Sequence, residues 1–178
     1  FIGLEGRFAE WAGSFVPFDK DILFVTEPGK ERETVVRLAR VGFERFLGYL
    51  ENSFETWKNS GEPVDMVINV EPDELMMDIP YDESLVVVDV RREPEFAEGH
   101  IKGAVNLPLS NLVDPGSMAD IDDMDNLYVH CATGYRSMIA ASILKRQGIH
   151  NLRNVVGGWE KIKEMEKVEV EKENSVLN

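Results

Sequence analysis

Apolar and polar positions along this chain alternate in blocks that predict short strands separated by helices. Residues 85–88 are four consecutive apolar residues, a pattern typical of a central strand in a parallel sheet. Similar short runs predict further strands at residues 67–70, 105–107, 127–129 and 154–156. Helical spacing predicts helices at residues 71–75 and 93–98, one that follows the 127–129 strand and ends near 147, and one that ends near 167. This alternation predicts an α/β fold with a mainly parallel sheet.

Two stretches of the same region are less regular. Residues 110–126 are rich in aspartate and are predicted to form a loop with one helical turn. The tail from Val168 alternates valine with charged residues, which leaves open either a frayed end or a short edge strand.

A smaller set of elements is predicted in residues 1–62. Apolar runs predict strands within residues 21–26 and 46–50, and helices are predicted around residues 7–12, 31–41 and 54–58. Residues 59–63 are polar and turn-rich, as in a linker. We therefore expect two units, residues 1–62 and residues 63–178.

The two units are related by a weak internal repeat. Leu23-Phe24-Val25 matches Leu127-Tyr128-Val129, and Arg40-Val41-Gly42 matches Arg146-Gln147-Gly148, with a period of roughly 105 residues. In this match Glu27 stands at the position of Cys131, so the first copy lacks a thiol there. Because the first copy has no counterpart of residues 64–104, we expect a half-domain whose sheet is completed by an upstream segment or a partner.

Charge and composition exclude several functions. The chain has 33 acidic and 19 basic residues, for a net charge of -14, which opposes binding to nucleic acid or to an anionic membrane. No apolar run approaches the roughly 20 residues that span a bilayer. The hydrophobic fraction of 43% is sufficient for a core.

One cysteine excludes an internal disulfide and, with no signal peptide, favours a cytoplasmic location. Because the chain begins at Phe1 in the middle of a pattern, we expect it to be a piece of a longer protein.

The candidate chemistry centres on that cysteine, Cys131, which follows a predicted buried strand and precedes a predicted helix. Backbone N–H groups at a helix start have no helical partner and favour a thiolate or another anion. Gly134 permits an unusual backbone conformation, Arg136 is suited to hold an anion, and Ser137 is suited to cap the helix. A cysteine that only fills the core needs none of these neighbours, so the pattern favours a nucleophile.

Four motifs within residues 64–165 together resemble the rhodanese family of sulfurtransferases. They occur in the family's order and at its spacing: Asp89-Val90-Arg91, His100-Ile101-Lys102-Gly103-Ala104-Val105-Asn106, Cys131-Ala132-Thr133-Gly134-Tyr135-Arg136-Ser137 and Gly157-Gly158-Trp159. The resemblance implies an α/β domain with a central parallel five-stranded sheet flanked by helices. It also implies that Cys131 accepts a sulfane sulfur as a persulfide and passes it to a thiophilic acceptor.

The resemblance further assigns roles to individual residues. Ala132, Thr133, Gly134, Tyr135 and Arg136 would form the cradle that binds the substrate. Asp89, Arg91 and Ser137 would support this loop. The partners of the protein would be a small sulfur donor, such as thiosulfate or a low-molecular-weight persulfide, and a thiol or cyanide acceptor. No cofactor is implied for this chain.

Residues 1–62 resemble the latter part of a degenerate, cysteine-less rhodanese repeat. A degenerate repeat followed by an active one is similar to the C-terminal part of a fusion in which a metallo-β-lactamase-fold domain precedes two rhodanese repeats and acts as a persulfide dioxygenase. An upstream domain of the same polypeptide is therefore an expected partner, and a homodimer remains an open alternative. We expect no metal site in this chain, because its three histidines form no spaced motif and one cysteine cannot build a thiolate site. The aspartates of residues 110–126 also lack the pattern of a calcium loop.

Two other functions remain as alternatives. The sequence from His130 to Arg136 is similar to a cysteine phosphatase signature, but only four residues separate Cys131 from Arg136, where that signature has five. The shorter loop suits a single sulfur better than a phosphate, so sulfur transfer is favoured. The chain could instead be a non-catalytic module that relays sulfur to another domain.

We expect His100 to be a structural hydrogen-bonding residue and His130 to pack within its strand.

Overall fold

The computed structural model describes residues 1–118, 121–122 and 124–173 and contains two compact units. We call Ile2–Met66 the N-terminal unit and Val67–Asn178 the C-terminal unit. The boundary expected between residues 62 and 63 lies a few residues before this division. No helix among the described residues is long and apolar enough to cross a membrane.

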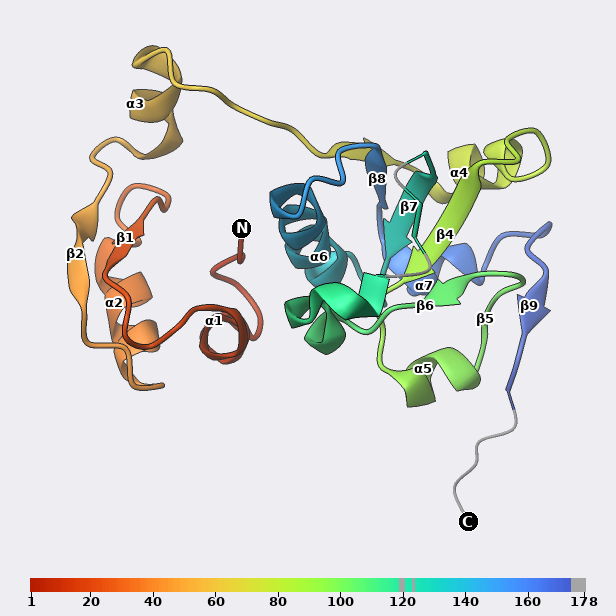
Figure 1. Cartoon of the computed structure of the whole chain (residues 1–178), viewed down its shortest axis with the longest axis horizontal. Helices are drawn as coiled ribbons and strands as arrows, with labels where there is room; N and C mark the ends of the chain where they lie inside the picture. Colours follow the sequence, from red (N-terminus) through yellow and green to blue (C-terminus); the bar gives the residue numbers. More distant parts are fainter. Residues whose placement is uncertain (119–120, 123, 174–178) are drawn as a thin grey trace. The chain divides into compact units, whose positions relative to one another are not determined.

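The C-terminal unit is built on a five-stranded parallel sheet with the strand order β3-β8-β7-β4-β6 (Figure 1). All four strand pairs in it are parallel. The strands are β3 (Ile68–Val70), β4 (Leu85–Asp89), β6 (Val105–Asn106), β7 (Asn126–His130) and β8 (Leu152–Val155). The predicted fold class, an α/β domain with a central parallel five-stranded sheet flanked by helices, is confirmed.

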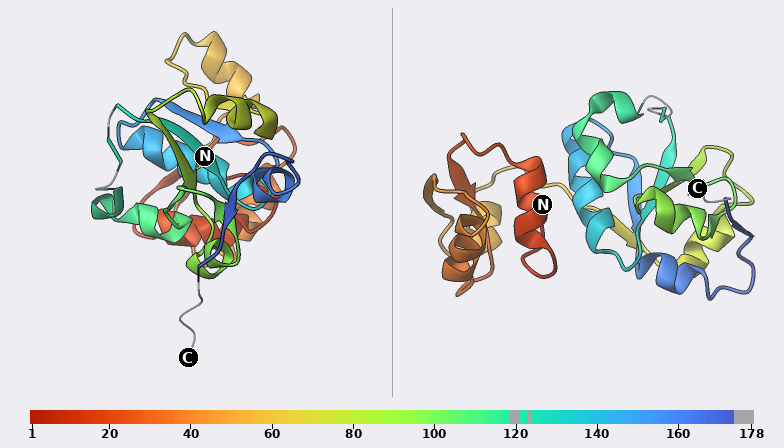
Figure 2. Two further views of the ribbon diagram at one scale, coloured as in Figure 1. Left: turned by 90° about the vertical axis from the view of Figure 1, so that its right-hand side faces the viewer. Right: turned by 90° about the horizontal axis from the view of Figure 1, so that it is seen from below.

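Helices cover both faces of this sheet. The helices are α4 (Pro72–Asp78), α5 (Glu93–Ala97), α6 (Tyr135–Arg146) and α7 (Gly158–Ile162). Leu75 of α4 and Ile162 of α7 pack in one cluster with Tyr128 of β7, so both helices lie on the face to which Tyr128 points. Figures 1 and 2 show α6 on the opposite side of the sheet. Leu127 and Val129 point to that side, because side chains alternate along a strand, and both are fully buried.

The C-terminal tail of this unit forms a short two-stranded ribbon with β5. β5 (His100–Ile101) pairs antiparallel with β9 (Val170–Glu171), so the tail forms the edge strand that the sequence left open. The prediction that the last helix continues to residue 167 is wrong. α7 ends at Ile162, because the chain then turns to bring β9 against β5.

The aspartate-rich stretch contains two 3₁₀ helices, η1 (Leu109–Val113) and η2 (Pro115–Met118), where one helical turn was expected. Asp120 and Asp123, which belong to this stretch, lie outside the described residues.

The N-terminal unit has the element order α1 (Phe8–Phe15), β1 (Ile22–Phe24), α2 (Glu31–Ala39), β2 (Phe46–Tyr49) and α3 (Ser53–Asn59). β1 and β2 are parallel, as are β7 and β8, and the strand–helix–strand–helix order is the same as β7-α6-β8-α7. The core of this unit consists of Phe8, Ala12, Leu38 and Phe43.

The strands of the two units can be matched by the faces to which their side chains point. Ile22 packs on the core below α2, whereas Leu23 is 72% exposed on the other face. Since Leu127 and Val129 face α6, the matching residues are Ile22 and Phe24, one position earlier than in the sequence match. Thr26, rather than Glu27, then stands at the place of Cys131, and neither side chain carries a thiol.

Candidate active site

Cys131 lies at the carboxyl end of β7, in the loop that leads into α6. Gly134 precedes the first helical residue, Tyr135, with a φ of 107°, a conformation that favours glycine. The backbone N–H of Gly134 donates a hydrogen bond to Cys131 Sγ at 3.1 Å. Cys131 is 1% exposed, whereas Thr133 is exposed. The predicted position of the thiol, between a strand and the start of a helix, is confirmed.

The first residues of α7 hold the carbonyl groups of this loop. Trp159 N–H donates to Cys131 O at 2.7 Å, and Glu160 N–H donates to Ala132 O at 3.1 Å. In a trans peptide the N–H points opposite to the C=O, and the described peptides are all trans. The N–H groups of Ala132 and Thr133 therefore point away from α7. The Gly157-Gly158-Trp159 motif thus orients the loop so that these donors remain available to an anion at Cys131.

Gly158 permits the close approach of α7 to this loop. Its φ is 57°, and a Cβ at this position would lie 2.2 Å from Cys131 O and 2.8 Å from Ala132 O. Both contacts are with backbone atoms, so no side-chain rotation would relieve them. A residue with a side chain at position 158 would therefore displace the loop that carries Cys131.

Arg136 is bound to Glu95, a residue that the sequence analysis did not identify. Glu95 lies on α5, and its two carboxylate oxygens accept hydrogen bonds from Arg136 Nη1 and Nη2, both at 2.7 Å. It also accepts from the backbone N–H and the Nε of Arg92, at 3.2 and 3.0 Å. The pair spans 41 residues of sequence, so no local pattern indicates it. In the sequence, Glu95 is the third residue of a short helix that has proline near its start. An acidic residue at this position commonly caps the helix, so nothing in the sequence indicated a second role.

The contribution of the Arg136–Glu95 pair to the free energy of unfolding should depend on pH. Hydrogen bonds from Arg136 are the main cause that lowers the pKa of Glu95 from 4.5 to about 2. A lowered pKa stabilises the folded state above the unfolded pKa, and this contribution is lost as the pH falls from about 4.5 towards 2. The difference in free energy of unfolding between the wild type and Glu95→Gln should therefore be largest near neutral pH and shrink towards pH ~3. Urea unfolding at several pH values measures this difference, and a constant difference would contradict the assignment.

Asp89 and Arg91 form a buried ion pair at the end of β4. Arg91 Nη2 lies 2.6 Å from Asp89 Oδ2, and the two side chains are 4% and 0% exposed. Arg91 also donates to Gly99 O at 2.7 Å, and its guanidinium lies 4.7 Å from the centre of the Trp159 ring. Since Trp159 N–H donates to Cys131 O, this pair is linked to the loop through Trp159 of α7.

Ser137 does not cap α6, so the prediction of a helix cap is wrong. It is the third residue of the helix, and its buried hydroxyl lies 3.0 Å from Gly134 O and 2.6 Å from Asn154 Oδ1 of β8. Gly134 takes the cap position because its left-handed conformation ends the loop. Ser137 therefore fastens the start of α6 to the sheet.

Among the hydrogen bonds of the described residues, none joins either of the two buried histidines to Cys131 Sγ. His100 stacks on Phe96 at 3.6 Å, with its Nδ1 2.9 Å from Phe96 O, which confirms its structural role. His130 is fully buried, with Nδ1 3.2 Å from Cys131 O and Nε2 3.8 Å from Asp89 Oδ2. Burial lowers the pKa of His130, so its ring is neutral at physiological pH and packs within the strand, as expected.

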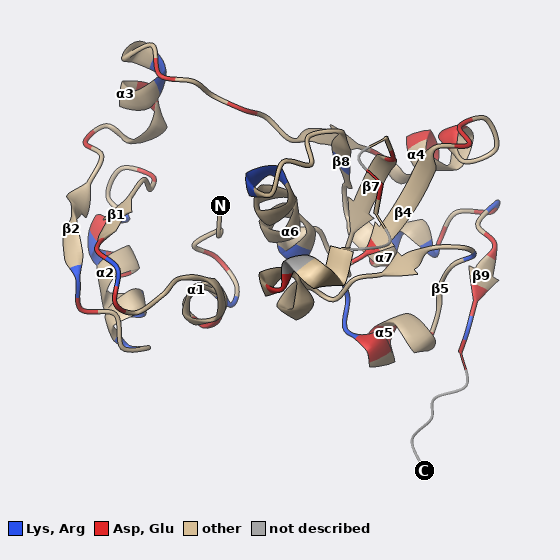
Figure 3. Cartoon of the chain, in the orientation of Figure 1, with Lys and Arg blue, Asp and Glu red and all other residues tan. Residues whose placement is uncertain are grey.

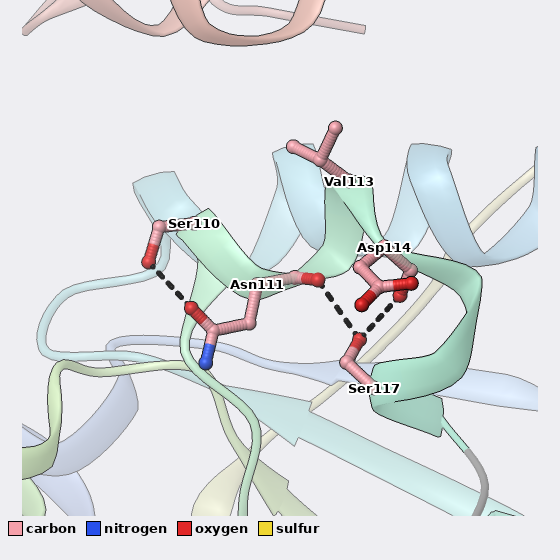
Figure 4. A pocket seen from close by; sticks show the side chains of 5 residues that line it. All are labelled: Ser110, Asn111, Val113, Asp114 and Ser117. Atoms are coloured by element: carbon pink, nitrogen blue, oxygen red, sulfur yellow. Dashed lines mark hydrogen bonds between the residues drawn. The ribbon is translucent and has the colours of Figure 1, made fainter.

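Two cavities lie away from this loop. One, of about 450 Å³, lies over η1 and η2 (Figure 4) and is lined by Ser110, Asn111, Val113, Asp114 and Ser117. Its polar groups bond to one another: Ser117 Oγ, for example, donates to backbone carbonyls of Asn111 and Asp114. The other, of about 580 Å³, lies between α4 and the turn after α7. Neither contains a thiol. Within the described parts of the chain, no three His, Cys, Asp or Glu side chains are grouped to hold a metal ion.

Several curated proteins similar to this chain carry the names of sulfur-handling proteins. A thiosulfate sulfurtransferase, GlpE of Pseudomonas fluorescens, is 37% identical over 79 residues, which cover 44% of this chain and 71% of GlpE. The proposed sulfur carrier protein YrkF of Bacillus subtilis is 31% identical over 101 residues, covering 57% of this chain and 54% of YrkF. The match thus spans only about half of YrkF.

Solved structures and a family model agree with the fold. A rhodanese-related protein from Thermoplasma volcanium superposes with a TM-score of 0.52 at 28% identity, covering 60% of this chain and 99% of that one. The model of the rhodanese-like domain matches residues 71–165, which is 95 of the 178 residues and includes both Asp89 and Cys131. The loop between β7 and α6, the buried pair at the end of β4 and the helix start at Gly158 all lie within this match. The chain therefore belongs to the rhodanese-like family.

Proposed function

We propose that the C-terminal unit is a sulfurtransferase that carries sulfane sulfur as a persulfide on Cys131. The observation that supports this most directly is the hydrogen bond from Gly134 N–H to Cys131 Sγ at 3.1 Å. It places the sulfur at the start of α6, where a negative charge is stabilised. Relatives that bear the name thiosulfate sulfurtransferase support the same chemistry.

The proposed reaction has two displacements at sulfur. The Cys131 thiolate attacks the outer sulfur of thiosulfate or of a low-molecular-weight persulfide, the S–S bond of the donor breaks, and sulfite or a thiolate leaves. The outer sulfur remains on Cys131 as a persulfide. Cyanide or a thiol then attacks that sulfur, and the Cys131 thiolate is regenerated. Each displacement breaks one S–S bond and forms one S–S or S–C bond. The reaction therefore needs no external oxidant or reductant, and the proposal includes no metal or redox cofactor.

The loop residues have distinct roles in this proposal. The N–H groups of Ala132, Thr133 and Gly134 stabilise the charge on the persulfide. Tyr135 and Arg136 begin α6 and set the position of these donors. Asp89, Arg91 and Ser137 act only by holding the loop and the helix in place.

Loading of sulfur onto Cys131 tests the proposal. Incubation of the chain with thiosulfate or glutathione persulfide should add the mass of one sulfur atom, which cyanide then releases as thiocyanate. Cys131→Ser should take up no sulfur, because a hydroxyl is a far weaker nucleophile at sulfur. Intact-mass spectrometry measures both, and the absence of any adduct on the wild type would contradict the function.

The same protein preparation separates the alternatives. Hydrolysis of p-nitrophenyl phosphate that disappears in Cys131→Ser would indicate a phosphatase. Sulfur loading without repeated turnover of small acceptors would indicate a relay module, with another protein or domain as the acceptor.

The wider context is also a proposal. We propose that the C-terminal unit works beside a metallo-β-lactamase-fold domain of the same polypeptide, in a reducing compartment such as the cytoplasm. The support is the arrangement of a unit without a cysteine before the unit with Cys131. Sequencing the gene upstream of Phe1 tests the fusion, and the molar mass in solution tests whether the chain forms a homodimer.

A further inference from the structure

The positive charge next to Cys131 is already neutralised. Arg136 lies close enough to Cys131 for their charges to interact, but both of its terminal nitrogens bind the carboxylate of Glu95. A bidentate pair of this kind is strong and leaves no net charge. The Arg136 and Glu95 side chains are 18% and 27% exposed, so water screens this pair only in part.

The other arginines of this region are also paired. Arg91 is buried against Asp89. Arg92 shares Glu95 with Arg136, so these three side chains carry one net positive charge, but the Arg92 side chain is 74% exposed and water screens its charge. α5 carries acidic residues at its start, drawn in red in Figure 3. They are Glu93 and Glu95 of its first turn. The less screened positive potential at the loop comes from the start of α6, which is equivalent to roughly half an elementary charge.

The two classes of sulfur donor differ in the charge that they bring to this loop. Transfer from thiosulfate joins a thiolate and a dianion, S–SO₃²⁻, and releases sulfite, which is also a dianion. Transfer from a persulfide, R–S–SH or R–S–S⁻, brings at most one negative charge at the reacting sulfur and releases R–S⁻. With the Cys131 thiolate included, thiosulfate brings three negative charges together and a persulfide at most two, so the half charge of the helix start offsets a larger share of the charge in the persulfide reaction.

We propose that Glu95 sets the donor specificity of this site, by neutralising Arg136 so that persulfides are favoured over thiosulfate. The proposal rests on the proposed function and narrows its donor class. In the favoured reaction the Cys131 thiolate attacks the outer sulfur of R–S–SH, the donor S–S bond breaks, and R–S⁻ leaves with the bonding electron pair. The proton stays on the transferred sulfur, so that Cys131–S–SH forms and no oxidant or reductant is required.

The rates of sulfur loading in matched variants test this proposal. The donors are thiosulfate and 2-hydroxyethyl persulfide, whose only charge lies on sulfur, and the readout is the rate at which Cys131 gains one sulfur atom. Glu95→Gln keeps the size of the side chain but removes its charge. We expect it to raise the ratio of the thiosulfate rate to the persulfide rate by about tenfold, since Arg136 then offers an unpaired charge. Taking the ratio cancels the intrinsic reactivity of each donor.

A control variant separates the release of Arg136 from a change in overall charge. Glu93→Gln removes the same charge from the same helix turn but leaves the Arg136–Glu95 pair intact. We expect it to change the ratio less than about twofold, because an exposed charge is screened by salt. Equal ratios in Glu95→Gln and Glu93→Gln would overturn the proposal.

The wild type provides a second test that does not depend on the folding of a variant. A neutralised arginine does not attract a dianion, so the thiosulfate rate should not fall as the ionic strength rises from low to physiological values. A steep fall would show a free cation at the site and would overturn the donor assignment alone. Loading by neither donor would instead overturn the proposed sulfur transfer itself.

Discussion

Replacing Gly158 by alanine is expected to slow sulfur loading of Cys131 by about 100-fold or more, since a displacement of ~1 Å at a reacting group has effects of this size. The new Cβ would lie 2.2 Å from Cys131 O. This is far shorter than any contact between a carbon and an oxygen atom that are not bonded. The new Cβ clashes with a backbone oxygen, so α7 and the loop must separate. Separation breaks the Trp159 N–H bond to Cys131 O, and the N–H groups of Ala132 and Thr133 then lose their orientation.

Loading rates with a persulfide donor measure this effect, with circular dichroism to confirm that the variant is folded. Gly148→Ala is a matched control. Gly148 has a φ of 98°, at least as unfavourable for alanine, but no atom lies within 4 Å of its Cβ position. We expect this variant to lose about 1 kcal/mol of stability and to load sulfur normally. Normal loading in Gly158→Ala would show that the contact with α7 does not position the loop.

Local patterns predicted the place of the thiol, and long-range contacts supplied most of the rest. The apolar run before Cys131 and the helical spacing after it are both local, and both were sufficient to locate the thiol at the end of a parallel strand. Glu95 was not predicted because its partner lies 41 residues away and an acid in a first helical turn is common. The function of Gly158 was also not predicted, because a glycine in a sequence can serve several purposes and only the approach of Cys131 O shows which one applies.

Two predictions were wrong because they relied on local residue preferences alone. Ser137 was expected to cap α6 because serine is frequent at helix starts, but the helix begins two residues earlier, after Gly134. The last helix was extended to residue 167 because charged and apolar residues continue at helical spacing there. Pairing of β9 with β5 outweighs that weak local preference and ends the helix at Ile162.

Removal of the Arg91 guanidinium is expected to destabilise the C-terminal unit by about 3–5 kcal/mol, because it leaves a charged group buried without its partner. Asp89 is 0% exposed, and its carboxylate accepts hydrogen bonds from the Nε and Nη2 of Arg91. In Arg91→Leu this carboxylate must lose its charge or bring water into the core. Arg91→Leu also frees Gly99 O and removes the cation that lies over Trp159.

Hydrogen exchange of the β4 and β7 amides measures the stability of this unit separately from the N-terminal unit. Lys102→Gln is the matched control, because Lys102 and Glu169 form an ion pair of similar length, 2.8 Å, with side chains that are 58% and 74% exposed. Water and salt screen an exposed pair, so this variant should differ little from the wild type. If Arg91→Leu lost no more stability than Lys102→Gln, the buried pair would not support the fold. Sulfur loading in the folded fraction of Arg91→Leu should still be slower, since Trp159 would lose the contact that fixes its backbone N–H on Cys131 O.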